Sequence, residues 1–91
     1  MKILKYGLAS HRHQTLMLPQ GAEILTVQLQ KEQLQLWAVV DETSPLEPRQ
    51  IARYYTGMSE LPLEPGRHIA TVQSEGGTHV DHFFEVTPNV F

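Results

Sequence analysis

Apolar and polar residues alternate with a period of two along two adjacent segments, residues 23–30 and 33–40. On one face of the second segment every side chain is apolar: Leu34, Leu36, Ala38 and Val40. This alternation is typical of a half-buried antiparallel strand, because an amphipathic helix repeats its apolar positions every third or fourth residue. Only Lys31 and Glu32 separate the segments, so we predict a β-hairpin with these two residues at its tip.

Apolar side chains also occur on the opposite face of this hairpin. With strict alternation, residues 23–30 present three apolar side chains on one face: Leu25, Val27 and Leu29. The other face then carries Ile24, beside Trp37 and Val39 of the second segment. A small sandwich buries one face of each sheet, so we expect the chain's own termini or another copy to cover the second face, which predicts a homo-oligomer. A single β-bulge would reverse the facing of every residue after it.

Five further segments are predicted as short strands: residues 2–8, 14–18, 49–56, 67–74 and 79–87. Pro19, which has no N–H for a ladder hydrogen bond, ends the second of these. A single helical turn over residues 50–54 is the alternative for the third. Residues 75–78 (EGGT) separate the last two, and a Gly-Gly pair between alternating segments is a good hairpin signal.

The remaining segments are predicted as connections. Residues 41–48 and 57–66 are rich in proline, glycine and acidic residues, and Pro88 ends the pattern before a short tail at residues 89–91. Six or seven short strands without a convincing long helix predict an all-β fold, either a small antiparallel β-sandwich or a partly open barrel. A chain of 91 residues has room for one core, so we predict a single β domain over residues 1–91.

Composition excludes several classes of function. The net charge is −3, and seven cationic residues spread along the chain do not form a stripe that could follow a nucleic-acid duplex. The absence of cysteine excludes disulfides, zinc fingers and thiol chemistry. No signal peptide is predicted at the N-terminus, and no segment approaches the ~20 apolar residues of a membrane span. We therefore expect a protein without membrane contact, in the cytoplasm of the cell that makes it.

No segment has the spacing of a known catalytic or nucleotide-binding motif. There is no G-x-S-x-G nucleophile elbow, no Walker loop and no G-x-G-x-x-G. The neighbouring carboxylates Asp41 and Glu42 lie in a predicted solvated loop, which does not give two carboxyl groups the different environments that acid/base catalysis requires. We therefore expect no enzyme activity, no catalytic residue and no cofactor.

Five histidines remain as candidates for metal or acid/base chemistry. His11 and His13 would point the same way on a strand, as two metal ligands can, and so would His79 and Asp81. The sequence assigns no third ligand to either pair, so no metal site is predicted. His82 interrupts an otherwise apolar face of its predicted strand, which predicts a core or interface histidine with satisfied hydrogen bonds.

The predicted strand over residues 49–56 is the strongest candidate for a binding site. Arginine offers a planar fork of donors for phosphate or carboxylate, and tyrosine offers a ring that stacks on a base or sugar. Side chains of both kinds share one face of this strand, and an exposed tryptophan and glutamines of other strands could complete a pocket. The predicted ligand-binding residues are Arg49, Arg53, Tyr55, Trp37, Gln28 and Gln73. The alternative is a solvated face whose arginines form ordinary cross-strand pairs with glutamates.

Several segments, in order along nearly the whole chain, resemble one known family. They are KILKY, LPQGAEILTVQLQ, LWAVVD, RYYTG, IATVQ and HFFEV. With these segments the chain resembles a family of small, functionally uncharacterised proteins that are encoded in bacteriophage and prophage genomes. The family has a Gly-Thr-Gly-like turn after the Arg/Tyr strand, where this chain has Thr56-Gly57-Met58. The resemblance implies a phage origin, a location in the host cytoplasm and a compact β domain, and it supplies no activity.

Two functions from different classes are expected. The first is a non-catalytic, phage-encoded binding protein that sequesters a nucleotide-derived host immune signal, of the cyclic or ADP-ribose type, at an interface between subunits. Arginines would hold its phosphates, and Trp37 or Tyr55 would stack on a base. The second is a protein–protein interaction module that inhibits a host protein or serves as an accessory phage component. Its contact surface would combine Ile24, Trp37 and Val39 with the acidic residues 41–47.

Overall fold

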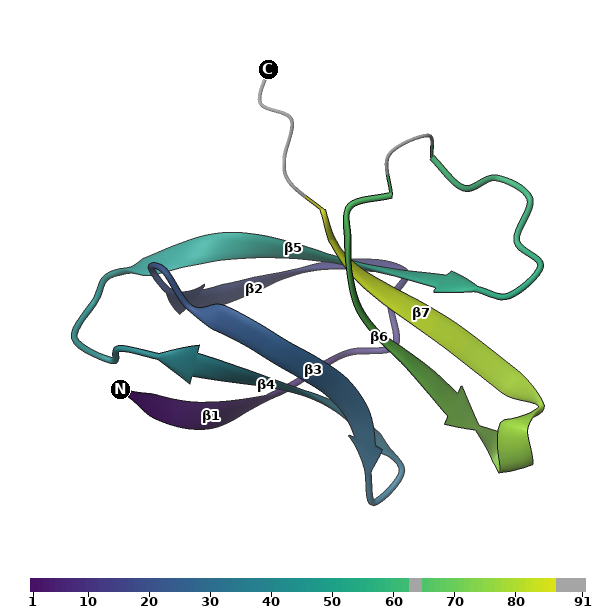
Figure 1. The fold of residues 1–91 in the computed structure, drawn as a ribbon, viewed down its shortest axis with the longest axis horizontal. Helices are drawn as coiled ribbons and strands as arrows, with labels where there is room; N and C mark the ends of the chain where they lie inside the picture. The colour runs from purple at the N-terminus through teal and green to yellow at the C-terminus, as the bar shows by residue number, and fades with distance from the viewer. Residues whose placement is uncertain (63–64, 87–91) are drawn as a thin grey trace.

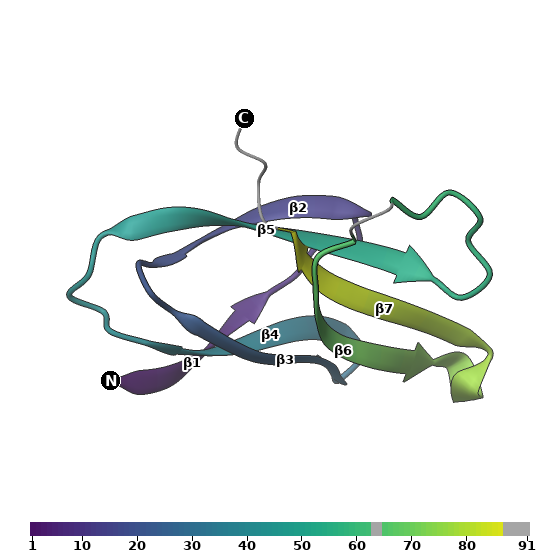
Figure 2. The same cartoon turned by 45° about the horizontal axis from the view of Figure 1, so that its top comes forward.

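The computed structural model describes residues 1–62 and 65–86, which form two antiparallel β-sheets packed face to face (Figure 1, Figure 2). The seven strands are β1 (Lys2–Gly7), β2 (His13–Pro19), β3 (Glu23–Gln30), β4 (Gln33–Val40), β5 (Leu46–Tyr55), β6 (Arg67–Ser74) and β7 (His79–Val86). One sheet has the strand order β1-β4-β3, and the other has the order β2-β5-β7-β6. The prediction of an all-β sandwich is confirmed, and the sheets do not close into a barrel. The described residues contain no helix with the length and apolar character that a membrane crossing requires.

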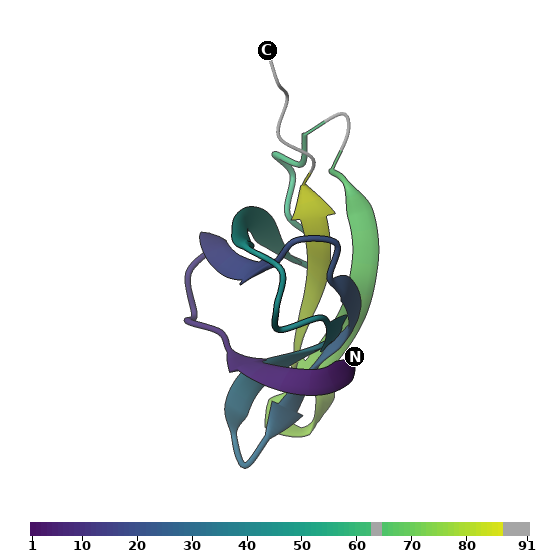
Figure 3. The ribbon, with the colours of Figure 1, turned by 90° about the vertical axis from the view of Figure 1, so that its left-hand side faces the viewer.

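The two sheets approach each other closely along one side. The edge strands β3 and β6, which belong to different sheets, pack against each other there. On the opposite side, residues 8–12 connect the edge strands β1 and β2. Figure 3 shows this arrangement from the side, with the β1–β2 connection on one flank and β6 on the other.

Both predicted hairpins are confirmed. Lys31 and Glu32, between β3 and β4, have positive φ angles of 52° and 67°. Two successive positive φ angles are typical of a type I′ turn, whose twist matches that of the paired strands. A short 3-10 turn, η1 (Glu75–Gly77), connects β6 to β7.

The core lies between the inner faces of the two sheets. Its largest fully buried side chains are Phe83, Leu18, Leu36, Ile51, Val27 and Val40. They come from β2, β3, β4, β5 and β7, so both sheets contribute. Burying a side chain of this size stabilises the fold by ~1.5–3 kcal/mol relative to exposure, so this layer holds the sheets together. The facing predicted for residues 33–40 is confirmed, because Ala38 is also fully buried and Leu34 packs against the core.

The facing predicted for the start of residues 23–30 is wrong. Ile24 is 4% exposed and belongs to the core, whereas Leu25 is 42% exposed. The reason is a β-bulge: Ile24 is paired with Ala38, but the next pair joins Thr26 to Trp37, so Leu25 is an extra residue in β3. An extra residue reverses the alternation at that point. Trp37 and its neighbour Val39 face outward, as predicted.

The predicted start of β5 is also wrong. We expected a loop over residues 41–48, but β5 begins at Leu46, and no helical turn forms over residues 50–54. Among the described residues, β7 pairs with β5 only from Gln50 onward, so the first residues of β5 have a neighbouring strand on one side only. Pro48 is paired with Met17 of β2, and within residues 1–62 and 65–86 no strand on its other side requires its missing N–H.

The other predicted boundaries agree with the structure to within one residue, where they can be compared. β1 ends at Gly7, and β2 begins at His13. The predicted connection over residues 57–66 joins β5 to β6, and its residues 63–64 lie outside the described residues. Thr87, Pro88 and the predicted tail also lie outside them.

Candidate ligand-binding cleft

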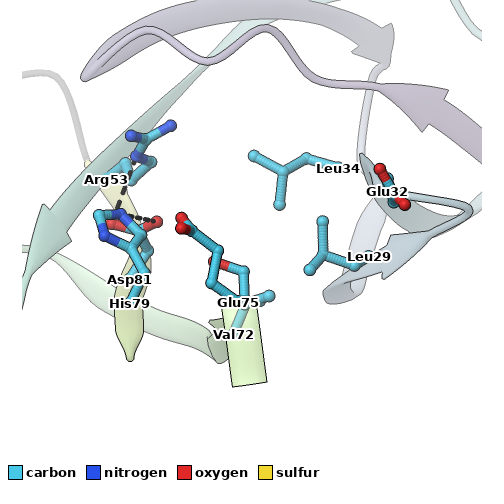
Figure 4. A pocket seen from close by; sticks show the side chains of 9 residues that line it. Leu29, Glu32, Leu34, Arg53, Val72, Glu75, His79 and Asp81 are labelled. Carbon is cyan, nitrogen blue, oxygen red and sulfur yellow. Dashed lines mark ion pairs between the residues drawn. The ribbon is translucent and has the colours of Figure 1, made fainter. Parts of the chain in front are cut away.

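A cleft opens between the two sheets where the tip of the β3–β4 hairpin lies opposite the β6–β7 turn (Figure 4). Its volume is about 550 Å³, which is within the range of small-molecule binding sites. Figure 4 shows Arg53, His79 and Asp81 on one side of the cleft and Leu29 and Leu34 on the other. The cleft therefore has a polar wall from the four-stranded sheet and an apolar wall from the hairpin.

Asp81 is the centre of the polar wall. It lies on β7, which runs between β5 and β6, and it is only 8% exposed. Its Oδ1 lies 3.4 Å from Arg53 Nε, and its Oδ2 lies 3.2 Å from His79 Nε2. A buried carboxylate is stable only when charged or hydrogen-bonding partners replace water. Asp81 thus holds both neighbouring side chains against the wall.

Arg53 is anchored at three points. Its backbone N–H donates to the carbonyl of Arg12 over 2.8 Å, and its Nη1 donates to the carbonyl of Ser10 over 3.0 Å. The third point is the ion pair with Asp81, and the side chain remains 25% exposed. Its contacts with the described residues involve Nε and Nη1, so the donors on Nη2 are available to a ligand.

A smaller pocket of about 250 Å³ adjoins the cleft and shares its polar wall. Besides Arg53, His79 and Asp81, it is lined by Ser10, Arg12 and Tyr55. Tyr55 is paired with Asp81 across β5 and β7, and its 48% exposure leaves the ring open to stack on a ligand.

The two pockets differ in their charge balance. In the smaller pocket, two arginines accompany one carboxylate. In the larger cleft, Arg53 accompanies three carboxylates, those of Glu32, Glu75 and Asp81. The smaller pocket therefore favours an anionic group, and the larger cleft favours an apolar or hydrogen-bond-donating group.

Arg49 shares a strand face with Arg53 but has a different environment. Its Nε and Nη2 both donate to the Glu85 carboxylate, and its Nη1 donates to the carbonyl of Ala22 over 2.8 Å. Hydrogen bonds from Arg49, and secondarily from Arg67, lower the pKa of Glu85. The hydrogen bond to Glu85 likewise raises the pKa of Arg49. The donors of Arg49 are used inside the chain, where they tie β5 to β7 and to the β2–β3 turn.

The structure brings together only two of the six predicted ligand-binding residues, Arg53 and Tyr55. Trp37 and Gln28 lie on the outer face of the three-stranded sheet, away from the cleft. Gln73 follows Val72 along β6, and because Val72 lines the cleft, Gln73 faces the outside of the four-stranded sheet. These three side chains and Arg49 do not line either pocket.

Most residues that line the two pockets were not predicted as ligand-binding, and the polar ones nearest to Arg53 include Arg12 in the smaller pocket and His79 and Asp81 in both. A signal existed for two of them, because His79 and Asp81 are two residues apart on a strand and so share a face. Their role at the wall depends on the neighbouring position of β5 and β7, which the sequence did not reveal.

The other histidines lie away from the cleft. His82 hydrogen-bonds through Nε2 to Thr56 Oγ1 over 2.8 Å and through Nδ1 to Thr71 Oγ1 over 3.0 Å. Its hydrogen bonds are therefore satisfied, as predicted, but its place in the core was predicted wrongly: Asp81 and Phe83 take the inner face of β7, so His82 lies half-buried on the outer face. His13 packs edge-on against the ring of Tyr54. Within residues 1–62 and 65–86, no three histidine, aspartate or glutamate side chains are grouped so that they could hold a metal ion.

The chain as a whole matches a protein family. A family model described as a domain of unknown function, DUF7352, matches residues 1–90, and so includes all seven strands and both pockets. The chain belongs to this family. Neither the curated proteins nor the solved structures contain a significant match to the chain. The function proposed below therefore rests on the residues and the geometry of the two pockets.

Proposed function

We propose that this protein is a non-catalytic binding protein and that its two adjoining pockets hold one small molecule with an anionic group. The observation that carries the proposal is the convergence of Arg12, Arg53, His79 and Tyr55 on the smaller pocket, beside a larger cleft with an apolar wall.

The chemistry of the pockets supports a nucleotide-type ligand. Arginine is well suited to phosphate because its planar fork donates several hydrogen bonds to neighbouring oxygens. Tyr55 supplies an exposed ring for stacking, and Leu29 and Leu34 supply apolar contact in the larger cleft. A ligand that spans both pockets presents its phosphate to Arg12 and Arg53 and its uncharged part to the hairpin. The site then lies within one chain.

The resemblance to phage and prophage proteins extends the proposal to a biological role. In this role the protein is phage-encoded and, in the host cytoplasm, sequesters a nucleotide-derived immune signal of the cyclic or ADP-ribose type. A binding protein without turnover suits sequestration, because it lowers the free concentration of a signal in proportion to its own abundance. The ligand should then be recovered chemically unchanged.

Isothermal titration calorimetry with ADP-ribose and with a cyclic dinucleotide tests the proposal on the full chain. We expect Arg53→Ala to weaken binding about tenfold or more, because a charge-assisted hydrogen bond contributes ~1.5–3 kcal/mol. Arg12→Ala is an independent second variant at an exposed side chain. Arg67→Ala is the matched control, since Arg67 pairs with Glu85 outside the cleft. Equal binding by the wild type and by both the Arg53→Ala and Arg12→Ala variants would exclude this site.

Native mass spectrometry of protein purified from phage-infected cells tests whether the protein binds a small molecule, without a choice of ligand in advance. The expected result is an added mass that is lost on unfolding and is absent from the Arg53→Ala variant. Protein that carries no such mass, together with no binding in calorimetry, contradicts the proposal.

A second candidate function is a protein–protein interaction module. It is favoured by the exposed Ile3 and Leu25 beside Trp37 on the outer face of the three-stranded sheet. Ile24, which the sequence placed on this surface, is in the core and takes no part. A stoichiometric complex with a host protein that Leu25→Glu disrupts and Arg53→Ala does not would support this function over the first.

A further inference from the structure

The outer face of the three-stranded sheet carries apolar side chains that the core does not use. Ile3 on β1 is 60% exposed, and Leu25 in the β3 bulge is 42% exposed. Val39 and Trp37 on β4 are half-buried. Ile3 is paired with Val39, and Leu25 is the extra residue of the bulge, next to Thr26, which is paired with Trp37. These four side chains form a diagonal row across the three strands, which we call the outer stripe.

Two charged residues flank the outer stripe, a lysine on one side and a glutamate on the other. Lys5 on β1 is the cross-strand neighbour of Trp37, and Glu23 on β3 is the cross-strand neighbour of Val39. Lys5 and Glu23 therefore lie at opposite corners of this part of the face, one on each side of the diagonal stripe. In the single chain, Lys5 Nζ donates to the amide oxygen Gln30 Oε1 over 2.7 Å. A carboxylate within reach of Lys5 would be a stronger acceptor than this neutral amide oxygen, because it carries a negative charge.

We propose that the outer stripe is the interface of a homodimer whose two-fold axis lies in the interface along the stripe. Rotation by 180° about this axis generates the second copy, whose stripe packs against the stripe of the first. The same rotation brings the lysine side of each stripe against the glutamate side of the other. Lys5 then comes over Glu23 of the partner subunit, and Glu23 comes over Lys5 of the partner subunit. An isologous interface must be complementary to itself in this way. The opposite charges on the two sides are therefore the reason for assigning this surface to a second copy.

The geometry of this dimer follows from the diagonal direction of the stripe. Because the axis runs obliquely to the strands, the strands of the two subunits cross steeply, as in orthogonal sheet packing. The apolar side chains of both stripes interdigitate between the two outer faces. The cleft opens between the inner faces of the sandwich and takes no part in the contact. The dimer therefore does not depend on the proposed ligand.

The size of the face sets the expected affinity. Three strands about 4.8 Å apart and eight residues at about 3.3 Å each give a face of roughly 14 by 26 Å. An interface of this size belongs to the low end of specific interfaces, below about 1,200 Å² of total buried area. We therefore expect a weak dimer that forms as the protein concentration rises and that dissociates at high salt, where the lysine–glutamate pairs are screened.

Sedimentation velocity of the full chain over a series of protein concentrations, at low and at high salt, tests the proposal. The wild type is expected to dimerise at low salt. Lys5→Glu and Glu23→Lys each place two like-charged pairs in the interface, so each should weaken dimerisation about tenfold or more. Both side chains are exposed, and the circular dichroism spectrum of each variant verifies that it is folded.

A mixture of the two single variants gives the sharpest result. In a heterodimer of Lys5→Glu with Glu23→Lys, both interface pairs again join a lysine to a glutamate. The mixture should therefore dimerise when neither variant does so alone. Lys31→Glu mixed with Glu60→Lys is the control, because it makes the same charge changes at exposed positions outside this face. This control mixture should behave as the wild type does.

Three results would overturn the proposal. A wild type that stays monomeric at every concentration would leave the outer stripe to a different protein. A dimer that neither single variant weakens would have its interface elsewhere. A variant mixture that associates no more than its components would contradict the two-fold pairing of Lys5 with Glu23.

Discussion

Asp81 Oδ1 lies 3.4 Å from Arg53 Nε, and this ion pair joins the two central strands of the four-stranded sheet beside the cleft. The pair holds a guanidinium where two pockets meet. Asp81 itself is buried, so its part in the proposed binding site is to position Arg53 and His79.

Asp81→Asn should therefore weaken the binding of an anionic ligand, although it removes a negative charge from the site. The loss of the carboxylate frees Arg53 from its position, and we expect affinity for ADP-ribose to fall about tenfold in isothermal titration calorimetry. Glu75→Gln is the control, because it removes a negative charge from the same cleft at an exposed position. If both variants bind the ligand as tightly as the wild type, Asp81 has no positioning role.

Glu85→Gln should destabilise the fold. Glu85 accepts two hydrogen bonds from Arg49 at a site where both side chains are 16% exposed. We expect urea unfolding at neutral pH to show a loss of about 2 kcal/mol, the usual range for hydrogen bonds between charged groups. Glu42→Gln breaks the exposed pair with Lys2 and should change stability by less than about 0.5 kcal/mol. Equal effects would mean that burial does not strengthen the Arg49–Glu85 pair.

The same residue gives a pH dependence with a defined sign. The pKa of Glu85 is lowered in the folded state, so the ionised carboxylate stabilises the fold. This stabilisation is complete above the ordinary pKa of 4.5 and is lost as the pH falls through the lowered value. The difference in unfolding free energy between the wild type and Glu85→Gln should shrink as the pH falls below 4.5. A difference that stays constant down to strongly acidic pH would contradict the assignment.

Gly66→Ala should destabilise the entry to β6. Gly66 has a φ of +107°, and an added Cβ would collide with the backbone carbonyl of Glu85. Because neither the backbone of β7 nor this φ angle can adjust cheaply, we expect a loss of about 2–4 kcal/mol in thermal or urea unfolding. Gly21 also has a positive φ, 79°, but an added Cβ there meets nothing within 4 Å. Gly21→Ala should therefore cost only about 1 kcal/mol, and a similar cost at Gly66 would mean that the close approach is absent.

The β3–β4 turn can be improved without any change to the core. Lys31 and Glu32 both have positive φ angles, which asparagine and glycine adopt at lower cost. The double variant Lys31→Asn, Glu32→Gly should raise stability by about 1 kcal/mol, measured as a higher midpoint of thermal unfolding. The reversed order, Lys31→Gly with Glu32→Asn, controls for composition and should gain less, since a type I′ turn prefers Asn-Gly. A loss of stability with Asn-Gly would exclude a type I′ turn at this position.

Local pattern was sufficient for most of the secondary structure. The alternation along residues 33–40 predicted which side of β4 is buried, because that strand is regular from end to end. In β3 the same reasoning failed at Ile24, because one extra residue shifts the alternation and the apolar Leu25 gives no sign of the bulge. Pro48 usually signals the end of a strand but lies inside β5, where it is paired with Met17 of β2. Sequence alone does not show this pairing, because Met17 is distant from Pro48 in the chain.

The sequence by itself determined the all-β class, the two hairpins and the presence of an Arg/Tyr face on β5, since these depend on residues close together in the chain. Only the tertiary structure decided what each arginine does. The antiparallel pairing of β5 with β7 sets Arg49 near Glu85 and Arg53 near Asp81. One arginine is thereby used inside the chain, and the other is left beside a cleft. Sequence spacing cannot distinguish the two, because the distinction depends on the charges that a strand distant in sequence places opposite each of them.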